Sequence, residues 1–334
     1  MNKKMYVKTP IEVTWSFTKR CNLNCSFCLI DAKKEYRLSK KLCEKVLDEI
    51  IKGKVLKVIL TGGEPLYEPS VFQIIKKLRY NGIAVELTTN GTLINKKILK
   101  KLADCGLREI QISINGSKAE INDYLMGKSF TKIINAIILS LEKDFNVHTK
   151  TTITSFNILD IPSLIEVLKS LGIKKIDLDE VVPMGRALLN YASLKPSLND
   201  LLKLDSIVDE INEKENKLEI EFSSFTLTMA NDGCAAECSI GDENSYCCTI
   251  TADGNLYPCT LSTLWNKENN IIDKGIIKAW KDISYFKKYI NEEKLEGDCS
   301  KCDTKKDCKG GCRPLAYAFS GNEWSEFPLC PRIG

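Results

Sequence analysis

Three cysteines near the N-terminus have the spacing of ligands for a single metal centre. Cys21, Cys25 and Cys28 occur as C-x3-C-x2-C in the segment RCNLNCSFC, directly after the strand-like run IEVTWSF. A structural zinc site takes four ligands, and no fourth Cys or His lies nearby, because Cys43 falls in the helical pattern that follows. A four-iron cluster held by three cysteines keeps one iron open to an outside ligand. The spacing therefore favours a reactive iron–sulfur cluster over structural zinc.

The same segment resembles the signature of the radical S-adenosylmethionine (radical SAM) enzymes, C-x3-C-x-aromatic-C, with Phe27 in the aromatic position. In that family the open iron chelates the methionine part of S-adenosylmethionine (SAM). An electron from the cluster then releases a 5′-deoxyadenosyl radical, which abstracts hydrogen from the substrate. The resemblance therefore implies a 4Fe-4S cluster bound to SAM.

Further motifs at predicted strand ends extend this resemblance. The run TGGEP (residues 61–65) resembles the GGEP motif, in which glycines let the backbone approach a ligand and a carboxylate suits the methionine ammonium. TNG (89–91) ends the next strand, as its counterpart in the family does. SING (113–116) resembles the ribose-contacting SxDG stretch, with Asn115 in place of the commoner Asp, and PMGR (183–186) resembles the PxGR turn. The cofactor-binding residues implied are Gly62, Gly63, Glu64, Asn90, Ser113 and Asn115.

Ten of the fifteen cysteines fall between residues 234 and 330. Their spacing resembles the seven-cysteine pattern of the SPASM domain, a C-terminal extension of certain radical SAM enzymes, and the run KGGCRPLAYAFSGN resembles it too. The resemblance implies two auxiliary 4Fe-4S clusters, although C-x2-C is also a zinc-binding spacing. The first would use Cys238, Cys259, Cys312 and one of Cys234, Cys247 and Cys248. Of these last three, we predict Cys234 and Cys248 as the metal-binding candidates. The second would use Cys299, Cys302, Cys308 and Cys330.

The remaining cysteines have simpler interpretations. A thiol of Cys247 or Cys248 that binds no cluster is a candidate hydrogen-atom donor, which an epimerase requires and a crosslinking enzyme does not. If SYCCTIT is a strand, these two side chains point to opposite faces. Cys43 and Cys105 lie in helical patterns and are expected to be inert core thiols.

The segments that carry the motifs alternate between strand-like and helical patterns. Six such alternations before residue 183 predict parallel strands with helical crossovers, and the resemblance implies a partial (β/α)6 barrel, similar to a TIM barrel, with its site at the strand ends. A further helix is expected over 198–215, before the Cys-rich region. We therefore predict a radical SAM core over 1–220 and a small Cys-rich domain with auxiliary clusters over 221–334.

Composition bears on the partners and the cellular compartment of this protein. The net charge of +4 and pI of about 8.2 arise from scattered lysines, which does not favour nucleic-acid binding. No signal peptide is visible, and the most apolar stretch (133–141) has nine residues and reads as a buried helix, so we expect no membrane contact. A reducing cytoplasm is then expected, in which clustered cysteines more often hold metal than form disulfides. His148 is the only histidine, which disfavours Ser–His–Asp catalysis and mixed Cys/His zinc sites, and its polar run predicts a structural or surface role.

The resemblance also implies a class of substrate. SPASM-bearing relatives mostly act on peptides or proteins, where they install crosslinks, epimerise residues or oxidise Cys or Ser to formylglycine. We therefore predict a radical SAM maturase that modifies a ribosomally made peptide or protein, with crosslinking ahead of epimerisation. The cluster loop begins at residue 21, which leaves no room for an N-terminal peptide-recognition domain, so a separate protein delivers the peptide or the core binds it directly. The reductant would be a flavodoxin or a ferredoxin.

Three alternatives stay open. A minority of relatives act on tetrapyrrole side chains in haem-type pathways. Formylglycine maturases tend to carry an Asp after the equivalent of Cys259, where this chain has Thr260. An electron carrier, whose clusters serve only as a redox wire, would produce no 5′-deoxyadenosine.

Overall fold

The computed structural model describes residues 7–33, 39–230 and 246–333, without the side chains of Tyr285 and Lys287. Its centre is a nine-stranded sheet with the order β7-β6-β5-β4-β3-β2-β1-β8-β9, in which every neighbouring pair is parallel except β8 with β9. The strands are β1 (Glu12–Thr18), β2 (Lys57–Gly62), β3 (Ala84–Thr89), β4 (Glu109–Ser113), β5 (Asn146–Ile153), β6 (Lys175–Glu180), β7 (Glu219–Ser223), β8 (Cys247–Thr251) and β9 (Leu256–Tyr257).

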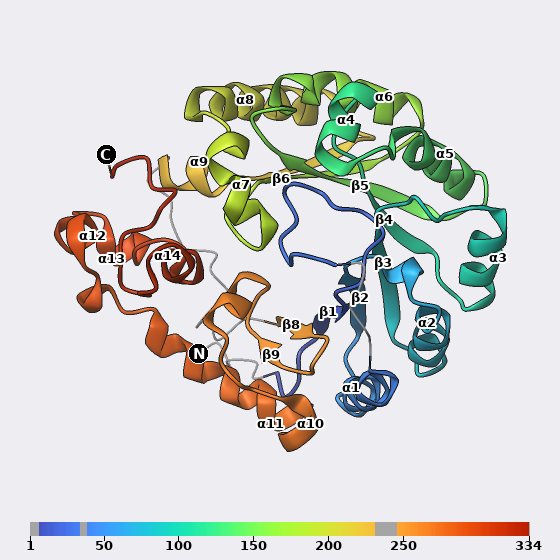
Figure 1. Cartoon of the computed structure of the whole chain (residues 1–334), viewed down its shortest axis with the longest axis horizontal. Coiled ribbons are helices and arrows are strands. Elements are labelled where there is room, and N and C mark those ends of the chain that lie inside the picture. Colours follow the sequence, from blue (N-terminus) through green and yellow to red (C-terminus); the bar gives the residue numbers. More distant parts are fainter. Residues whose placement is uncertain (1–6, 34–38, 231–245, 334) are drawn as a thin grey trace.

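Helices connect the parallel strands and cover one face of the sheet, while the cysteine loop lies on the other, inner face (Figure 1). In the first two thirds of the chain the helices are α1 (Lys40–Lys52), η1 (Pro65–Tyr67), α2 (Val71–Tyr80), α3 (Lys96–Asp104), α4 (Ala119–Met126), α5 (Phe130–Leu141), η2 (Ile158–Asp160), α6 (Ile161–Ser170), α7 (Arg186–Leu194), α8 (Leu198–Lys214) and α9 (Phe225–Ala230). In the last third they are η3 (Leu261–Trp265), α10 (Ile271–Lys274), α11 (Ile276–Lys281), η4 (Asp282–Tyr289), η5 (Glu292–Lys294), α12 (Gly297–Lys301), α13 (Lys305–Cys308) and α14 (Arg313–Ser320).

The alternation of side chains along each strand separates the two faces of the sheet. Val13, Trp15 and Phe17 of β1 are buried in the main hydrophobic core, as are Val58 and Leu60 of β2. The alternate residues point to the inner face and are mostly polar or charged, such as Glu12 and Lys57, which pair with each other, although Ile59 is apolar. Apolar side chains therefore fix the sheet under its helices, and the inner face carries polar groups.

The predicted parallel sheet with helical crossovers is confirmed, and so are the helices expected over 133–141 and 198–215, which are α5 and α8. Two features were not expected. The crossover from β4 to β5 contains two helices, α4 and α5, and β7 extends the six predicted strands.

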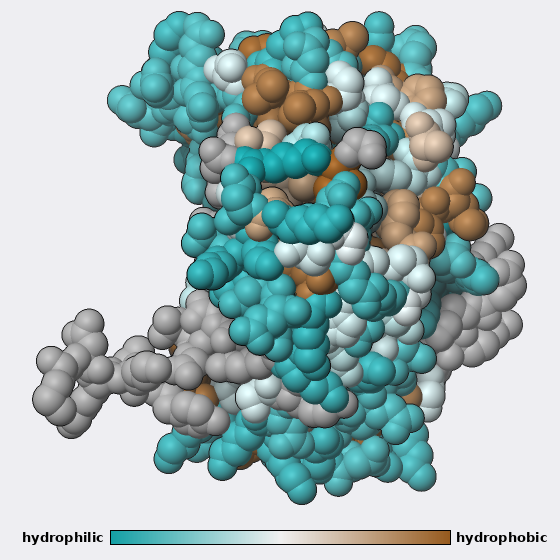
Figure 2. All heavy atoms as spheres, turned by 90° about the vertical axis from the view of Figure 1, so that its left-hand side faces the viewer, coloured by the Kyte–Doolittle hydropathy of each residue, from teal (hydrophilic) through white to brown (hydrophobic). Residues whose placement is uncertain are grey.

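β8 lies in the predicted C-terminal domain but pairs in parallel with β1 of the predicted core. The sheet therefore continues across residue 220. The last third of the chain then runs along one side of the sheet (Figure 1). That side of the molecule is mostly hydrophilic, with separate hydrophobic patches (Figure 2). No helix in the described ranges has the length and apolar character needed to cross a membrane.

Candidate active site

The three N-terminal cysteines lie together in the loop that follows β1. Cys21, Cys25 and Cys28 are close enough for their charges to affect one another. Burial raises the pKa of the Cys21 thiol to about 11 and that of Cys25 to about 12. Backbone N–H groups of Leu23 and Ala32 donate to the sulfurs of Cys21 and Cys28, each at 3.4 Å. The structure thus brings the three predicted ligands together, with hydrogen-bond donors already aimed at two of the sulfurs.

The glycines of the TGGEP run hold this loop against the end of β2. The backbone N–H of Gly63 donates to the carbonyl of Thr18 at 2.8 Å. A Cβ atom at Gly62 would lie 2.2 Å from the Thr18 carbonyl oxygen, and one at Gly63 would lie 2.2 Å from that of Arg20. Both glycines are therefore needed for backbone packing beside Cys21, a role that the sequence motif did not reveal.

Glu64 is a fully buried carboxylate without a cationic partner among the described side chains. Its Oε1 accepts from the backbone N–H of Leu66 at 2.9 Å and from the Thr89 hydroxyl at 2.7 Å, and its Oε2 accepts from the backbone N–H of Asn90 at 2.7 Å. Burial raises its pKa to about 7 although these hydrogen bonds oppose the rise. A carboxylate accepts about four hydrogen bonds, so one position remains open for a positively charged group.

Asn90 connects the end of β3 to the cysteine loop. Its Nδ2 donates to Asn22 Oδ1 at 3.0 Å and lies 3.9 Å from the sulfur of Cys21. Its Oδ1 accepts from the backbone N–H of Thr92 at 3.0 Å. Asn22 was not singled out from the sequence, because only the fold brings it beside the TNG turn.

The two predicted sites after β4 differ in their surroundings. Ser113 is the last residue of β4 and is partly exposed on the inner face, beside Lys150 of β5. Asn115 is 1% exposed, and its Oδ1 accepts from the backbone N–H of Thr152 at 2.8 Å. Its Nδ2 lies 3.0 Å from the sulfur of Met126. The side chain of Asn115 therefore already ties β4 to β5 and α4, and its contact with SAM stays a prediction.

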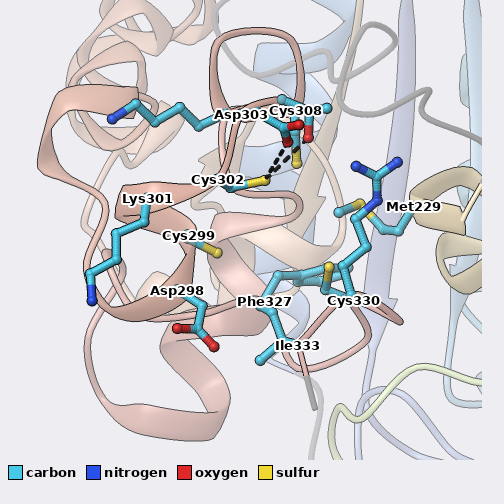
Figure 3. Close-up of a pocket in the computed structure, with 14 residues that line it drawn as sticks. Met229, Asp298, Cys299, Lys301, Cys302, Asp303, Cys308, Phe327, Cys330 and Ile333 are labelled. Carbon is cyan, nitrogen blue, oxygen red and sulfur yellow. Dashed lines mark hydrogen bonds between the residues drawn. The ribbon is translucent and has the colours of Figure 1, made fainter.

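The four cysteines predicted for the second auxiliary cluster line one cavity. This cavity has a volume of about 260 Å³ and is bordered by Cys299, Cys302, Cys308 and Cys330 (Figure 3). Burial raises the pKa values of Cys299 and Cys330, and neighbouring thiols of the same set contribute to both increases. The lining also carries three cations, Arg332, Lys301 and Lys305, against the two carboxylates of Asp298 and Asp303.

The cysteines predicted for the first auxiliary cluster are less completely described. Cys259 and Cys312 precede η3 and α14, which pack against each other. Cys247 and Cys248 lie on β8 and face opposite ways: Cys248 is 2% exposed in the core, and Cys247 is on the inner face beside Glu12. Continuing the β8–β9 register by two pairs beyond Thr249 and Tyr257 would bring Cys247, not Cys248, opposite Cys259.

The remaining cysteines and the histidine that the sequence singled out lie away from these cysteine groups or outside the described residues. Cys234 and Cys238 lie outside the described residues. Cys43 is buried in the core, and Cys105 is partly buried at the end of α3. His148 lies on β5 with 13% of its side chain exposed and its Nε2 3.4 Å from Glu86 Oε1. Over the described ranges, no three His, Cys, Asp or Glu side chains are close enough to enclose a single metal ion.

The residues fit the two groups that the sequence implies. Three thiols of one loop, two of them accepting backbone N–H groups, suit a cluster, which is larger than a single metal ion and whose sulfur ligands are tuned by hydrogen bonds. The buried carboxylate of Glu64 suits a cationic amino group beside that cluster. Asn90 links the two sites, because its backbone N–H lies 2.7 Å from Glu64 and its side chain reaches Cys21.

Comparison with known proteins shows what this chain is similar to. Residues 15–174 match the radical SAM superfamily. The chain is 28% identical to the AdoMet-dependent heme synthase of Methanosarcina barkeri, over 96% of both chains. It is 27% identical to the mycofactocin maturase MftC of Mycobacterium tuberculosis, over 93% of this chain and 80% of the relative. It is 26% identical to the PqqA peptide cyclase of Rhodopseudomonas palustris, over 96% of this chain and 86% of the relative.

A solved structure shares the fold. SuiB of Streptococcus suis, solved bound to S-adenosylmethionine, superposes with a TM-score of 0.75 and 22% identity, over 97% of this chain and 78% of SuiB. The shared fold extends beyond residues 15–174 and includes the Cys-rich last third of the chain.

Proposed function

We propose that this chain, whose residues 15–174 match the radical SAM superfamily, is an enzyme that modifies a ribosomally made peptide or protein. In this proposal Cys21, Cys25 and Cys28 hold a 4Fe-4S cluster, and Glu64 holds the amino group of SAM. When bound, the two cofactors supply a 5′-deoxyadenosyl radical for hydrogen abstraction. The observation that carries the proposal is the meeting of three thiols with a buried, cation-free carboxylate at the carboxyl ends of neighbouring parallel strands.

We further propose auxiliary 4Fe-4S clusters in the last third of the chain. The cavity lined by Cys299, Cys302, Cys308 and Cys330 supports the second of them (Figure 3). For the first, the register of β8 favours Cys247 over Cys248 as the fourth ligand beside Cys238, Cys259 and Cys312.

Two relatives support a peptide substrate, and one supports a second candidate function. The maturase and the peptide cyclase match this chain over nearly its whole length, which favours peptide modification. The AdoMet-dependent heme synthase matches it as extensively, so modification of a tetrapyrrole side chain is the second candidate.

The charge of the inner face supports the first of these two candidates. Lys57 lies between Glu12 and Glu86, and Lys150 pairs with Asp179. Carboxylates nevertheless outnumber cations on this face, although the whole chain has a net charge of +4. The charged residues there are Glu12, Lys57, Glu86, Glu109, Lys150, Lys175, Asp177, Asp179, Glu219 and Glu221. Such a surface repels a tetrapyrrole that carries several carboxylates, and it favours a neutral or basic peptide segment.

The position of Cys247 bears on the kind of modification. It is the first residue of β8, whereas the radical site lies at the carboxyl ends of the strands. The four steps to Thr251 span about 13 Å at 3.3 Å per residue. Cys248 lies one step nearer but faces the core. Neither thiol is placed to quench a substrate radical beside SAM, so we propose crosslinking ahead of epimerisation.

Radical chemistry at low potential needs a strong one-electron donor and a reducing compartment. We propose a flavodoxin or a ferredoxin as the donor and the cytoplasm as the compartment, because clustered thiols such as those of the cysteine loop stay reduced there. The peptide would reach the inner face directly or through a separate recognition protein.

The test is SAM cleavage by anaerobically reconstituted protein, followed as 5′-deoxyadenosine. The variant with Cys21, Cys25 and Cys28 all changed to Ala should lose it, and turnover near the wild-type rate would refute the cluster assignment. The substrate is tested with a short peptide encoded beside this gene and, separately, with a propionate-bearing tetrapyrrole. Mass loss from the tetrapyrrole with no change in the peptide would favour the second candidate. Deuterium from deuterated water at a peptide α-carbon would favour epimerisation over crosslinking.

A further inference from the structure

The PMGR turn after β6 lies directly against the cysteine loop. Arg186 Nη1 donates to the carbonyl of Cys25 at 2.8 Å, and Nη2 donates to the carbonyl of Ala32 at 2.7 Å. The backbone N–H of Arg186 donates to the carbonyl of Cys28 at 2.9 Å. One residue therefore binds the loop at three carbonyls, two of which belong to proposed cluster ligands.

The neighbours of Arg186 show that the turn is shaped for this contact. Gly185 has φ +58°, and a Cβ atom there would lie 2.3 Å from the carbonyl oxygen of Leu29 and 2.7 Å from that of Cys28. One turn along α7, the side-chain amide of Asn190 donates to the carbonyl of Ser26 at 3.0 Å. The first turns of α7 thus follow the cysteine loop closely, and only glycine fits at the point of nearest approach.

Arg186 also brings positive charge to the loop. Its side chain is 14% exposed, and its guanidinium lies 3.2 Å from Asp31, whose side chain is 44% exposed. A cation at this position stabilises negative charge on the thiolates, and water screens it only weakly because the guanidinium is largely buried.

We propose that Arg186 is a positioning residue for the radical SAM cluster, with two effects. Its planar guanidinium bridges the carbonyls of Cys25 and Ala32 and keeps the loop in its ligand-bearing shape. Its charge favours the reduced cluster, because reduction adds a negative charge to the same site. The inference rests on the proposed assignment of the cluster to Cys21, Cys25 and Cys28.

Two variants separate the effects of shape and charge. Arg186→Lys keeps the charge, but an ammonium cannot bridge two carbonyls as a guanidinium does. Arg186→Met removes both charge and bridge while it keeps most of the side-chain volume. Arg79→Met is the matched control, because Arg79 also donates to a backbone carbonyl, that of Ile83, at the opposite end of the sheet. Each protein is reconstituted and assayed for iron loss to a chelator and for the midpoint potential of the SAM-responsive cluster by electron paramagnetic resonance.

Both Arg186 variants should lose about four irons to the chelator at least tenfold faster than wild type, since each lacks a charge-assisted bridge. The midpoint potential should fall in Arg186→Met and stay near wild type in Arg186→Lys, and Arg79→Met should match wild type in both measurements. Wild-type stripping rates in both Arg186 variants would overturn the inference while leaving the cluster assignment intact. A wild-type protein whose iron content equals that of the Cys21, Cys25 and Cys28 triple alanine variant would overturn both. If Arg186→Met does not fold, a stripping rate in Arg186→Lys equal to wild type still overturns the inference.

Discussion

The affinity of this protein for SAM should depend steeply on pH, because Glu64 ionises near neutrality. The pKa of Glu64 is raised to about 7 by complete burial, against the hydrogen bonds from Asn90, Thr89 and Leu66. Above pH 7 the side chain is a carboxylate that attracts the amino group of SAM. Below pH 7 it is a neutral acid, and this attraction is lost as the pH falls.

The size of the effect follows from the ionised fraction. With a pKa of about 7, roughly nine tenths of Glu64 is ionised at pH 8 and roughly one tenth at pH 6. If only the carboxylate form binds SAM, the affinity for SAM should fall about tenfold from pH 8 to pH 6. Binding at pH 6 should also release a proton, because SAM favours the ionised form.

Glu64→Gln is the perturbation that isolates this group. At pH 8 it should weaken SAM binding by about tenfold, because a charge-assisted hydrogen bond is replaced by a neutral one. It should also lack the Glu64 step in the pH profile. The amino group of SAM titrates as well, so the informative quantity is the difference between the wild-type and Glu64→Gln profiles.

The assay is equilibrium binding of SAM to anaerobically reconstituted protein from pH 6 to pH 8. Glutamine presents an N–H group to one of the three donors that now bond to Glu64, so thermal unfolding must confirm that the variant is folded. Glu86→Gln, on the inner face beside Lys57, is the control for removing a buried carboxylate elsewhere in the barrel. Identical pH profiles for wild type and Glu64→Gln would refute the reasoning and point to the backbone of Gly62 and Gly63 instead.

Three further predictions follow from the same structure. Reconstituted protein should contain about twelve irons per chain, from three four-iron clusters; about eight irons with an intact SAM-binding cluster would mean that one auxiliary site is absent or holds zinc. Cys247→Ala should lose about four of these irons while Cys248→Ala keeps them and instead lowers the free energy of unfolding by on the order of 1 kcal/mol, as a small core truncation does; the opposite pattern by iron analysis would restore Cys248 as the ligand. Gly63→Ala should lower the free energy of unfolding by about 1–3 kcal/mol through overpacking against Arg20 and should impair cluster loading. Gly82→Ala strains a backbone φ of +76° but adds a Cβ with no atom within 4 Å, and it should load its clusters normally.

The sequence by itself determined the local features of this protein. Alternating strand patterns and amphipathic helices predicted a parallel sheet with crossovers, because side-chain periodicity depends only on near neighbours. The spacing of Cys21, Cys25 and Cys28 was equally local, since a segment of eight residues brings the three thiols to one loop. The spacing of Cys299, Cys302 and Cys308 indicated one group for the same reason.

Only the tertiary structure decided which distant groups meet and how far water is excluded from them. The contact of Arg186 with Cys25 joins residues 161 positions apart, and no local pattern specifies it. The burial of Glu64, which sets its pKa, comes from the packing of β2, β3 and the cysteine loop around it. The difference between Cys247 and Cys248 appears only when β8 pairs with β1 and β9, because a strand pattern separates two faces without showing which face turns inward. Side-chain periodicity is a property of a single segment, whereas the burial and the charge environment of a side chain depend on the assembled fold.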